Sequence, residues 1–144
     1  MKAPAILVVD DDPALRKALT VFLKLQFAVF SAGSMEEAME VLEDNGADAV
    51  LLDYRMPGKD GLAGLPELRE KYSDVPVVML TGYGDQALFA KAKELGASCC
   101  LKKPIDLMDV LSTVIKVVEE KDAAAQKAAA EDAEGGAAFG SAEG

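Results

Sequence analysis

The chain has 144 residues, of which 51% are hydrophobic and 28% are charged, a composition typical of one globular domain. Its formal net charge of −10 argues against direct nucleic-acid binding, because neutralising phosphates requires clustered lysine and arginine. The absence of histidine excludes Ser-His-Asp and Cys-His catalysis, histidine-ligated zinc and a phosphohistidine carried by this chain.

The first predicted elements are a strand and a helix. A continuous apolar run over residues 5–9 predicts a strand that is buried on both faces. Asp12-Pro13 then predicts a helix start, because an aspartate can accept from free N–H groups and proline suits the first helical position. Large apolar side chains follow at helical spacing: Leu15, Leu19, Phe22 and Leu23.

The next three elements repeat this alternation. A weaker strand pattern covers residues 28–31. Ser34 and Glu37 fit a capping box at the start of a second helix, and Gly46 is expected to end it. A third apolar run, residues 49–52, predicts a buried strand that ends directly before Asp53.

The remaining elements follow the same order. A helix is predicted over residues 62–72, where Pro66 is tolerated only near the first turn. Strands are predicted over residues 75–80 and 98–101, with a helix over residues 85–95 between them. A final helix is expected from about Asp106 through Val118.

The chain divides into a domain, residues 1–121, and a tail, residues 122–144. The tail contains ten alanines, four glycines, five acidic residues and one lysine, without an apolar period. Alanine is the best helix former, so residues 123–130 could prolong the last helix. From Gly135 onward we expect disorder, and the tail is interpreted as a disordered end or a linker.

Five strands that alternate with five helices predict an α/β fold with a parallel sheet. At this length, a flavodoxin-like three-layer α/β/α sandwich with strand order 2-1-3-4-5 fits best. Ligands of such folds lie at the carboxyl ends of the strands where the strand order reverses, here between strands one and three.

Chemically active side chains collect at this edge. Asp10 and Asp11 follow the first strand, Asp53 the third, Thr81 ends the fourth, and Lys103 follows the fifth. Three carboxylates persist together most easily around a hard cation, so we expect Mg²⁺, with Mn²⁺ as the alternative. A carboxylate can also attack phosphorus, and the metal and a lysine would neutralise the transferring group.

These residues lie in four segments that resemble the receiver domains of response regulators in bacterial two-component signalling systems. The segments are Ile-Leu-Val-Val-Asp-Asp-Asp at residues 6–12, Asp-Tyr-Arg-Met-Pro-Gly-Lys-Asp-Gly at 53–61, Met-Leu-Thr-Gly at 79–82, and Lys-Pro at 103–104. The resemblance covers residues 5 to about 120.

The resemblance implies a role for each matching residue. Asp53 would accept the phosphoryl group. Asp10, Asp11 and Asp53 would hold Mg²⁺ together with the backbone carbonyl of Arg55.

The resemblance also implies how the signal is received and passed on. Thr81 would move toward the phosphoryl group and Lys103 would pair with it, with a Lys103-Pro104 bond that is typically cis. A sensor histidine kinase or phosphotransfer protein would donate the phosphate, and an unknown output protein would read the fourth helix, fifth strand and fifth helix. We expect autocatalytic phosphotransfer and autodephosphorylation rather than conventional enzyme activity. The chain would be a stand-alone receiver or a fragment of a longer regulator, and a homodimer stays open.

One position departs from this family. Cys100 stands where the family carries a tyrosine or phenylalanine three residues before the lysine, which supports the alternative of a degenerate receiver that binds partners without phosphorylation. Cys99 and Cys100 are adjacent on a predicted strand, so they should point to opposite faces and form no mutual disulfide. So few cysteines favour a reducing cytoplasm, and no apolar run or signal-peptide pattern predicts membrane insertion.

The sequence gives less support to two other functional interpretations. Residues 82–87 match a loose dinucleotide-binding fingerprint, but they follow the fourth strand instead of the first. A phosphohydrolase with Asp53 as nucleophile would need a general acid where Arg55 stands. We also ask whether Tyr83 overhangs the phosphoaspartate and slows its hydrolysis.

Overall fold

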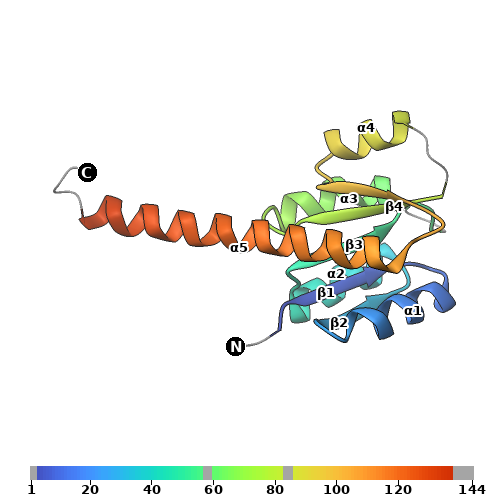
Figure 1. Ribbon diagram of the computed structural model, residues 1–144. Coiled ribbons are helices and arrows are strands. Elements are labelled where there is room, and N and C mark those ends of the chain that lie inside the picture. The colour runs from blue at the N-terminus through green and yellow to red at the C-terminus, as the bar shows by residue number, and fades with distance from the viewer. Residues whose placement is uncertain (1–2, 57–59, 83–85, 138–144) are drawn as a thin grey trace.

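Five strands and five helices alternate along the part of the chain that this computed structural model describes, residues 3–56, 60–82 and 86–137 (Figure 1). The strands are β1 (Ala5–Val9), β2 (Ala28–Ala32), β3 (Ala49–Asp53), β4 (Val77–Thr81) and β5 (Cys99–Lys102). The helices are α1 (Pro13–Leu23), α2 (Met35–Asn45), α3 (Gly61–Lys71), α4 (Gln86–Glu94) and α5 (Leu107–Ala137).

The five strands form one parallel sheet in the order β2-β1-β3-β4-β5, which confirms the predicted topology. Helices α1 and α5 pack on one face of the sheet, and α2, α3 and α4 lie on the other (Figure 1). The strand order reverses between β1 and β3, so their carboxyl ends frame the crevice where such folds bind ligands.

Burial on both faces explains why the strands are continuously apolar. Along β1, Ile6 and Val8 belong to the core under α1 and α5, whereas Leu7 and Val9 belong to the core on the other side. All four side chains are fully buried. Neither face of β1 can therefore carry a polar residue until the strand ends at the site edge.

Local capping sets the helix boundaries as predicted. The Asp12 carboxylate accepts from the Ala14 N–H at 3.0 Å and so begins α1. The Ser34 hydroxyl accepts from the Glu37 N–H at 3.1 Å at the start of α2. Gly46 ends α2 with a φ of 71°, a left-handed conformation that favours glycine.

Helix α3 differs from its prediction. It begins at Gly61 behind the cap Asp60, and Pro66 lies inside the helix, beyond the first turn where we expected it to be confined. Proline cannot donate to the carbonyl four residues before it, here that of Leu62. Pro66 is exposed, so water can reach this side of the helix.

Helix α5 is much longer than the helix predicted from about Asp106 through Val118. It runs for 31 residues to Ala137, and its second half projects away from the sheet (Figure 1). The helix thus continues past residue 130 and through Gly135, where we expected disorder; residues 138–144 lie outside the described part. Lys121 pairs with Asp48 at 3.6 Å and ties the base of this extension to the sheet. The division at residue 121 stays a prediction.

Within the described ranges, none of the helices combines the length and the apolar character that crossing a membrane requires.

Candidate functional site

The carboxyl ends of β1 and β3 bring three carboxylates together. Asp10 directly follows β1 and Asp53 is the last residue of β3, so the pairing of these two strands places them side by side. One oxygen each from Asp10, Asp11 and Asp53 lies within 4.8 Å of the others. Asp10 and Asp53 are 0% and 2% exposed, whereas Asp11 faces solvent. The cluster therefore has a buried floor and one open side.

Lys103 reaches this cluster from the other side of β4. Its Nζ lies 2.9 Å from Asp53 Oδ1 and 3.6 Å from Asp10 Oδ2. The Lys103 N–H donates to the Thr81 carbonyl at 2.7 Å, which fixes the backbone where the side chain begins. The Lys103-Pro104 bond is cis, as the resemblance implied. The ammonium is thus held against the carboxylate that we expect to react.

Burial and the neighbouring charges act in opposite directions on Asp53. Burial raises the pKa of the Asp53 carboxyl, the hydrogen bond and charge of Lys103 oppose this, and the charges of Asp10 and Asp11 raise it further, so that the pKa lies above its usual value. For Lys103, burial lowers the pKa, but the hydrogen bond and charge of Asp53, with Asp10, raise it overall. The lysine therefore stays an ammonium at neutral pH.

The remaining contacts of Asp10 fit a divalent cation. Asp10 Oδ1 accepts from the Asp12 N–H at 2.9 Å. Asp10 Oδ2 is buried and has no hydrogen-bond donor among the described residues, since Lys103 Nζ is too distant at 3.6 Å. A buried carboxylate oxygen without a donor is costly unless a cation satisfies it. The all-oxygen donor set suits Mg²⁺ better than zinc.

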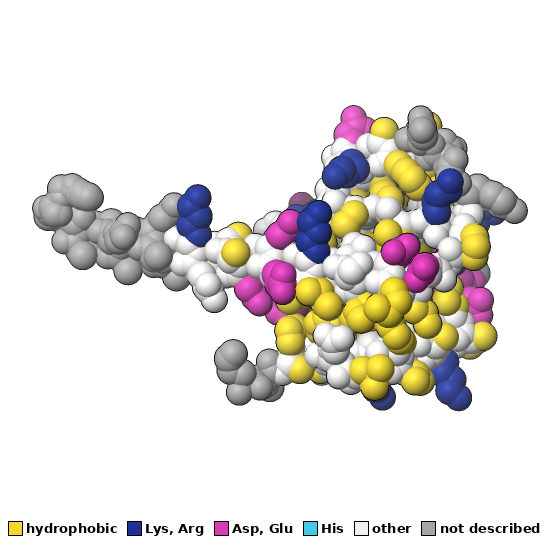
Figure 2. Space-filling view, viewed as in Figure 1, with side chains coloured by type: hydrophobic (Ala, Val, Ile, Leu, Met, Phe, Trp, Pro, Cys, Tyr) yellow, Lys and Arg dark blue, Asp and Glu magenta, His cyan; other side chains and the backbone are white. Residues whose placement is uncertain are grey.

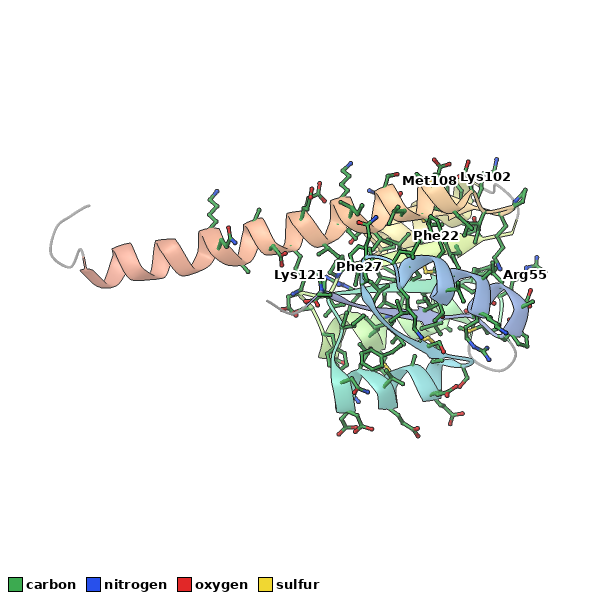
Figure 3. All side chains as sticks on the ribbon, turned by 60° about the horizontal axis from the view of Figure 1, so that its bottom comes forward. Phe22, Phe27, Arg55, Lys102, Met108 and Lys121 are labelled. Carbon is green, nitrogen blue, oxygen red and sulfur yellow. The ribbon has the colours of Figure 1, made fainter. Side chains whose placement is uncertain are left out.

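Arg55 lies beside this cluster, two residues after the end of β3. Its exposed side chain extends outward at the site end of the molecule, opposite the α5 extension (Figure 3). A pocket of about 370 Å³ adjoins the site and is lined by Asp11, Tyr54, Arg55, Met56 and Asp60. Arg55 thus lines the same pocket as Asp11, and the role of its backbone carbonyl as a metal ligand stays a prediction.

Thr81 lies at the same edge, but its hydroxyl is hydrogen-bonded to the backbone of β5 instead of to the carboxylates. The side chain is fully buried at the end of β4, and Oγ1 donates to the Leu101 carbonyl at 3.5 Å, a long hydrogen bond. A Cβ added to Gly82 would meet nothing within 4 Å, so the space beyond Thr81 is open. Tyr83, which we considered as a cover for the phosphoaspartate, lies outside the described residues.

Sequence reasoning gave no role to Gly61. A Cβ built on Gly61 would lie 2.3 Å from the Asp53 carbonyl oxygen, and the Gly61 N–H donates to the Tyr54 carbonyl at 2.9 Å. The start of α3 therefore packs directly against the backbone of Asp53. A glycine at the first position of a helix was the available signal, but the partner across the loop was not visible in the sequence.

The two cysteines point to opposite faces of β5, as predicted. Cys99 packs against the core under α1 and α5, and Cys100 against the other core. Burial raises the pKa of both thiols, so both remain protonated and weakly reactive at neutral pH.

A family model of the response regulator receiver domain matches residues 6–116, which include all of the acidic and basic residues of this site. The chain belongs to the response regulator receiver domain family. Receivers of this family are typically phosphorylated on an aspartate, generally bind Mg²⁺ in an acidic pocket, and interact with histidine kinases or phosphotransfer proteins.

Two curated relatives differ in how much of their length this receiver covers. Sporulation initiation phosphotransferase F of Bacillus subtilis (strain 168) is 32% identical over 117 residues, which are 81% of this chain and 94% of that protein. The C4-dicarboxylate transport transcriptional regulatory protein DctD of Rhizobium meliloti (strain 1021) is 38% identical over 120 residues, 83% of this chain but only 26% of that protein. The receiver thus matches nearly all of one relative and about a quarter of the other.

A solved structure supports the fold. The CheY-like response regulator receiver domain protein from Methanospirillum hungatei JF-1 superposes with a TM-score of 0.80 at 23% identity, over 84% of this chain and 98% of that one. At this identity the likeness shows the fold, which the two chains share over nearly the whole of the solved domain.

Proposed function

We propose that this receiver is a phosphorylation-dependent switch in which Asp53 accepts a phosphoryl group from a phosphohistidine on a sensor histidine kinase or phosphotransfer protein. The observation that carries the proposal is the contact of the Asp53 carboxylate with Lys103 at 2.9 Å inside a cluster of three aspartates. If the Asp53–Lys103 ion pair served stability alone, the carboxylates of Asp10 and Asp11 would not be needed beside it, because their negative charges repel that of Asp53.

The transfer uses groups that are already in place. An Asp53 carboxylate oxygen attacks phosphorus, the bond from phosphorus to the donor histidine nitrogen breaks, and that nitrogen keeps the electron pair. The Lys103 ammonium neutralises charge on the transferring group. Asp10, Asp11, Asp53 and the Arg55 carbonyl would hold Mg²⁺, which supplies further positive charge at the phosphoryl oxygens.

Thr81 is suited to sense the product. Its long hydrogen bond to the Leu101 carbonyl is weak, so phosphoryl oxygens on Asp53 can compete for the hydroxyl. Movement of Thr81 would pull on the chain that leads into α4. Among the described side chains of α4, Ala92 alone is fully buried, so the helix shares little of the core and can shift at low cost. We place the output face on α4, β5 and α5.

An apolar groove beside the site is the proposed docking surface for the phosphoryl donor. It has a volume of about 610 Å³ and lies between α1 and the start of α5, two elements that begin next to the site residues. Two of the large apolar side chains that are exposed among the described residues, Val21 (60%) and Leu25 (79%), line it, and a third, Met108 (63%), follows the lining residue Leu107. Figure 2 shows apolar side chains gathered over this region, and in Figure 3 Phe22 lies where α1 faces α5.

This groove suits an apolar helical surface of a partner, because side chains of such a surface can fill the space between two helices. A donor seated there would approach Asp53 from the open side of the acidic cluster. Direct contact of this chain with nucleic acid is still not expected. Some relatives are transcriptional regulators, but this chain matches only about a quarter of their length.

The alternative is a degenerate receiver that binds partners without phosphorylation. Cys100 favours it, because a cysteine cannot take the place of the aromatic ring that reports phosphorylation in the family. The acidic residues, Thr81 and Lys103 favour the phosphorylated switch.

Intact mass distinguishes the two. The chain is incubated with Mg²⁺ and acetyl phosphate beside an Asp53→Asn variant. The switch predicts one added phosphoryl group that disappears in the variant and when EDTA removes the metal. An unmodified mass, in a sample shown to bind Mg²⁺, would contradict self-catalysed phosphorylation and favour the degenerate receiver.

A further inference from the structure

Arg16 connects α1 to the metal-binding edge of the sheet. It lies in the first turns of α1, and its Nη1 donates to the main-chain carbonyl of Asp10 at 2.6 Å. The side chain is half-buried. The guanidinium therefore reaches back over the end of β1 instead of extending into solvent.

This contact completes the fixation of the Asp10 backbone. The Asp10 N–H donates to the Ala32 carbonyl at 3.0 Å, and its Oδ1 accepts from the Asp12 N–H. With Arg16 on the carbonyl, both main-chain polar groups and one carboxylate oxygen of Asp10 are held. The oxygen left without a donor is Oδ2, which faces Lys103 and the acidic cluster.

Gly33 leaves the space that the guanidinium occupies. A Cβ built on Gly33 would lie 3.1 Å from Arg16 Nη1, tighter than ordinary contact. The Gly33 N–H donates to Glu37 Oε1 at 2.7 Å, so the loop before α2 is itself held in place. A side chain at residue 33 would therefore displace the guanidinium rather than the loop.

We propose that Arg16, in the space left by Gly33, is a positioning residue for the divalent-cation site: it holds the Asp10 carbonyl and thereby aims the buried Asp10 carboxylate at the cation. The inference rests on the proposed function only in assuming that the acidic cluster binds Mg²⁺. Groups that orient a metal ligand from behind typically change metal affinity by about 10–100-fold when removed.

The charge of Arg16 and its positioning role predict opposite effects on Mg²⁺ affinity when the residue is replaced. Removing a positive charge near a cation site reduces repulsion, so electrostatics alone would tighten Mg²⁺ binding. Loss of positioning would weaken it, because Asp10 could then turn away from the cluster. The direction of the change therefore separates the two effects.

The test measures the Mg²⁺ dissociation constant of the full chain by titration calorimetry, without phosphorylation. Arg16→Met should weaken binding by about 10-fold. Lys24→Met removes the same charge from the exposed residue that caps the C-terminus of α1, and it should not weaken binding. Gly33→Ala should weaken binding in the parent chain and have no further effect in the Arg16→Met background, because both act through one contact.

Two results would overturn the inference: Arg16→Met binding Mg²⁺ as tightly as the parent, or Gly33→Ala weakening binding equally in both backgrounds. Thermal unfolding in EDTA confirms that each variant is folded. If Arg16→Met does not fold, the Mg²⁺ affinity of Gly33→Ala in the parent chain still tests the inference. Failure of the parent chain itself to bind Mg²⁺ would instead count against the proposed function, and would remove the inference with it.

Discussion

The α-carbon of Gly61 faces the main-chain carbonyl of Asp53 so closely that a Cβ at residue 61 would lie 2.3 Å from the carbonyl oxygen. The start of α3 thus forms the back wall of the site. Any side chain at residue 61 has to move either the helix or the backbone of the residue that we expect to be phosphorylated.

We therefore expect Gly61→Ala to destabilise the domain by about 1–3 kcal/mol, the usual cost of forcing extra volume into a packed region. Urea denaturation measures this change. Gly82→Ala is the matched control, because its Cβ would meet nothing within 4 Å, and it should leave the free energy of unfolding within about 1 kcal/mol of the parent value. Equal stability of Gly61→Ala and the parent chain would show that α3 can shift freely.

The raised pKa of Asp53 predicts a pH-dependent stability. Its ionised form is disfavoured in the folded chain relative to the unfolded chain, so the folded state loses stability as the pH rises from the unfolded value of 3.8 through the higher folded pKa. Asp53→Asn removes this loss. In EDTA, the variant should be more stable than the parent at pH 7, and the difference should shrink as the pH falls toward 4. Thermal unfolding across this range checks it; a constant difference would refute the assigned cause.

Mg²⁺ should stabilise the folded chain, because the unfolded chain does not bring the three aspartates together. A free Mg²⁺ concentration of 100 times Kd corresponds to about 2.7 kcal/mol. The increase in Tm should be lost or greatly reduced in Asp10→Asn, since this change removes charge from the buried oxygen that lacks a donor. An undiminished increase in this variant would place the cation elsewhere.

The groove between α1 and α5 predicts separate effects on two phosphate donors. Leu25→Glu places a charge on a leucine that is 79% exposed, and it should slow phosphotransfer from a histidine kinase that phosphorylates the parent chain. Losing the burial of one leucine side chain against the kinase costs about 1.5–3 kcal/mol, so we expect the rate of phosphotransfer to decrease at least about 10-fold. Labelling by acetyl phosphate should not change.

Gln26→Glu is the control for this experiment, because it adds the same charge at an adjacent exposed residue. The docking surface would be wrong if both variants slowed transfer equally, or if neither did.

Local signals account for the parts of this receiver that sequence reasoning predicted well. Asp12, Ser34 and Gly46 set helix ends through contacts with residues at most a few positions away. Pro66 shows the limit of such reasoning, because α3 continues through an exposed proline that local rules confine to the first turn. The length of α5 was underestimated, since two glycines near its end outweighed the alanines in the prediction.

The sequence by itself determined the order of the elements, the parallel sheet and the edge at which Asp10, Asp53, Thr81 and Lys103 gather. Burial patterns and caps act over short stretches of chain, and few strand orders satisfy right-handed crossovers. Only the tertiary structure decided that Lys103 contacts Asp53, that Arg16 holds the Asp10 carbonyl, and that Gly61 backs the site. These contacts depend on the register and twist of strands far apart in the chain, to within about an ångström, and no local pattern carries that information.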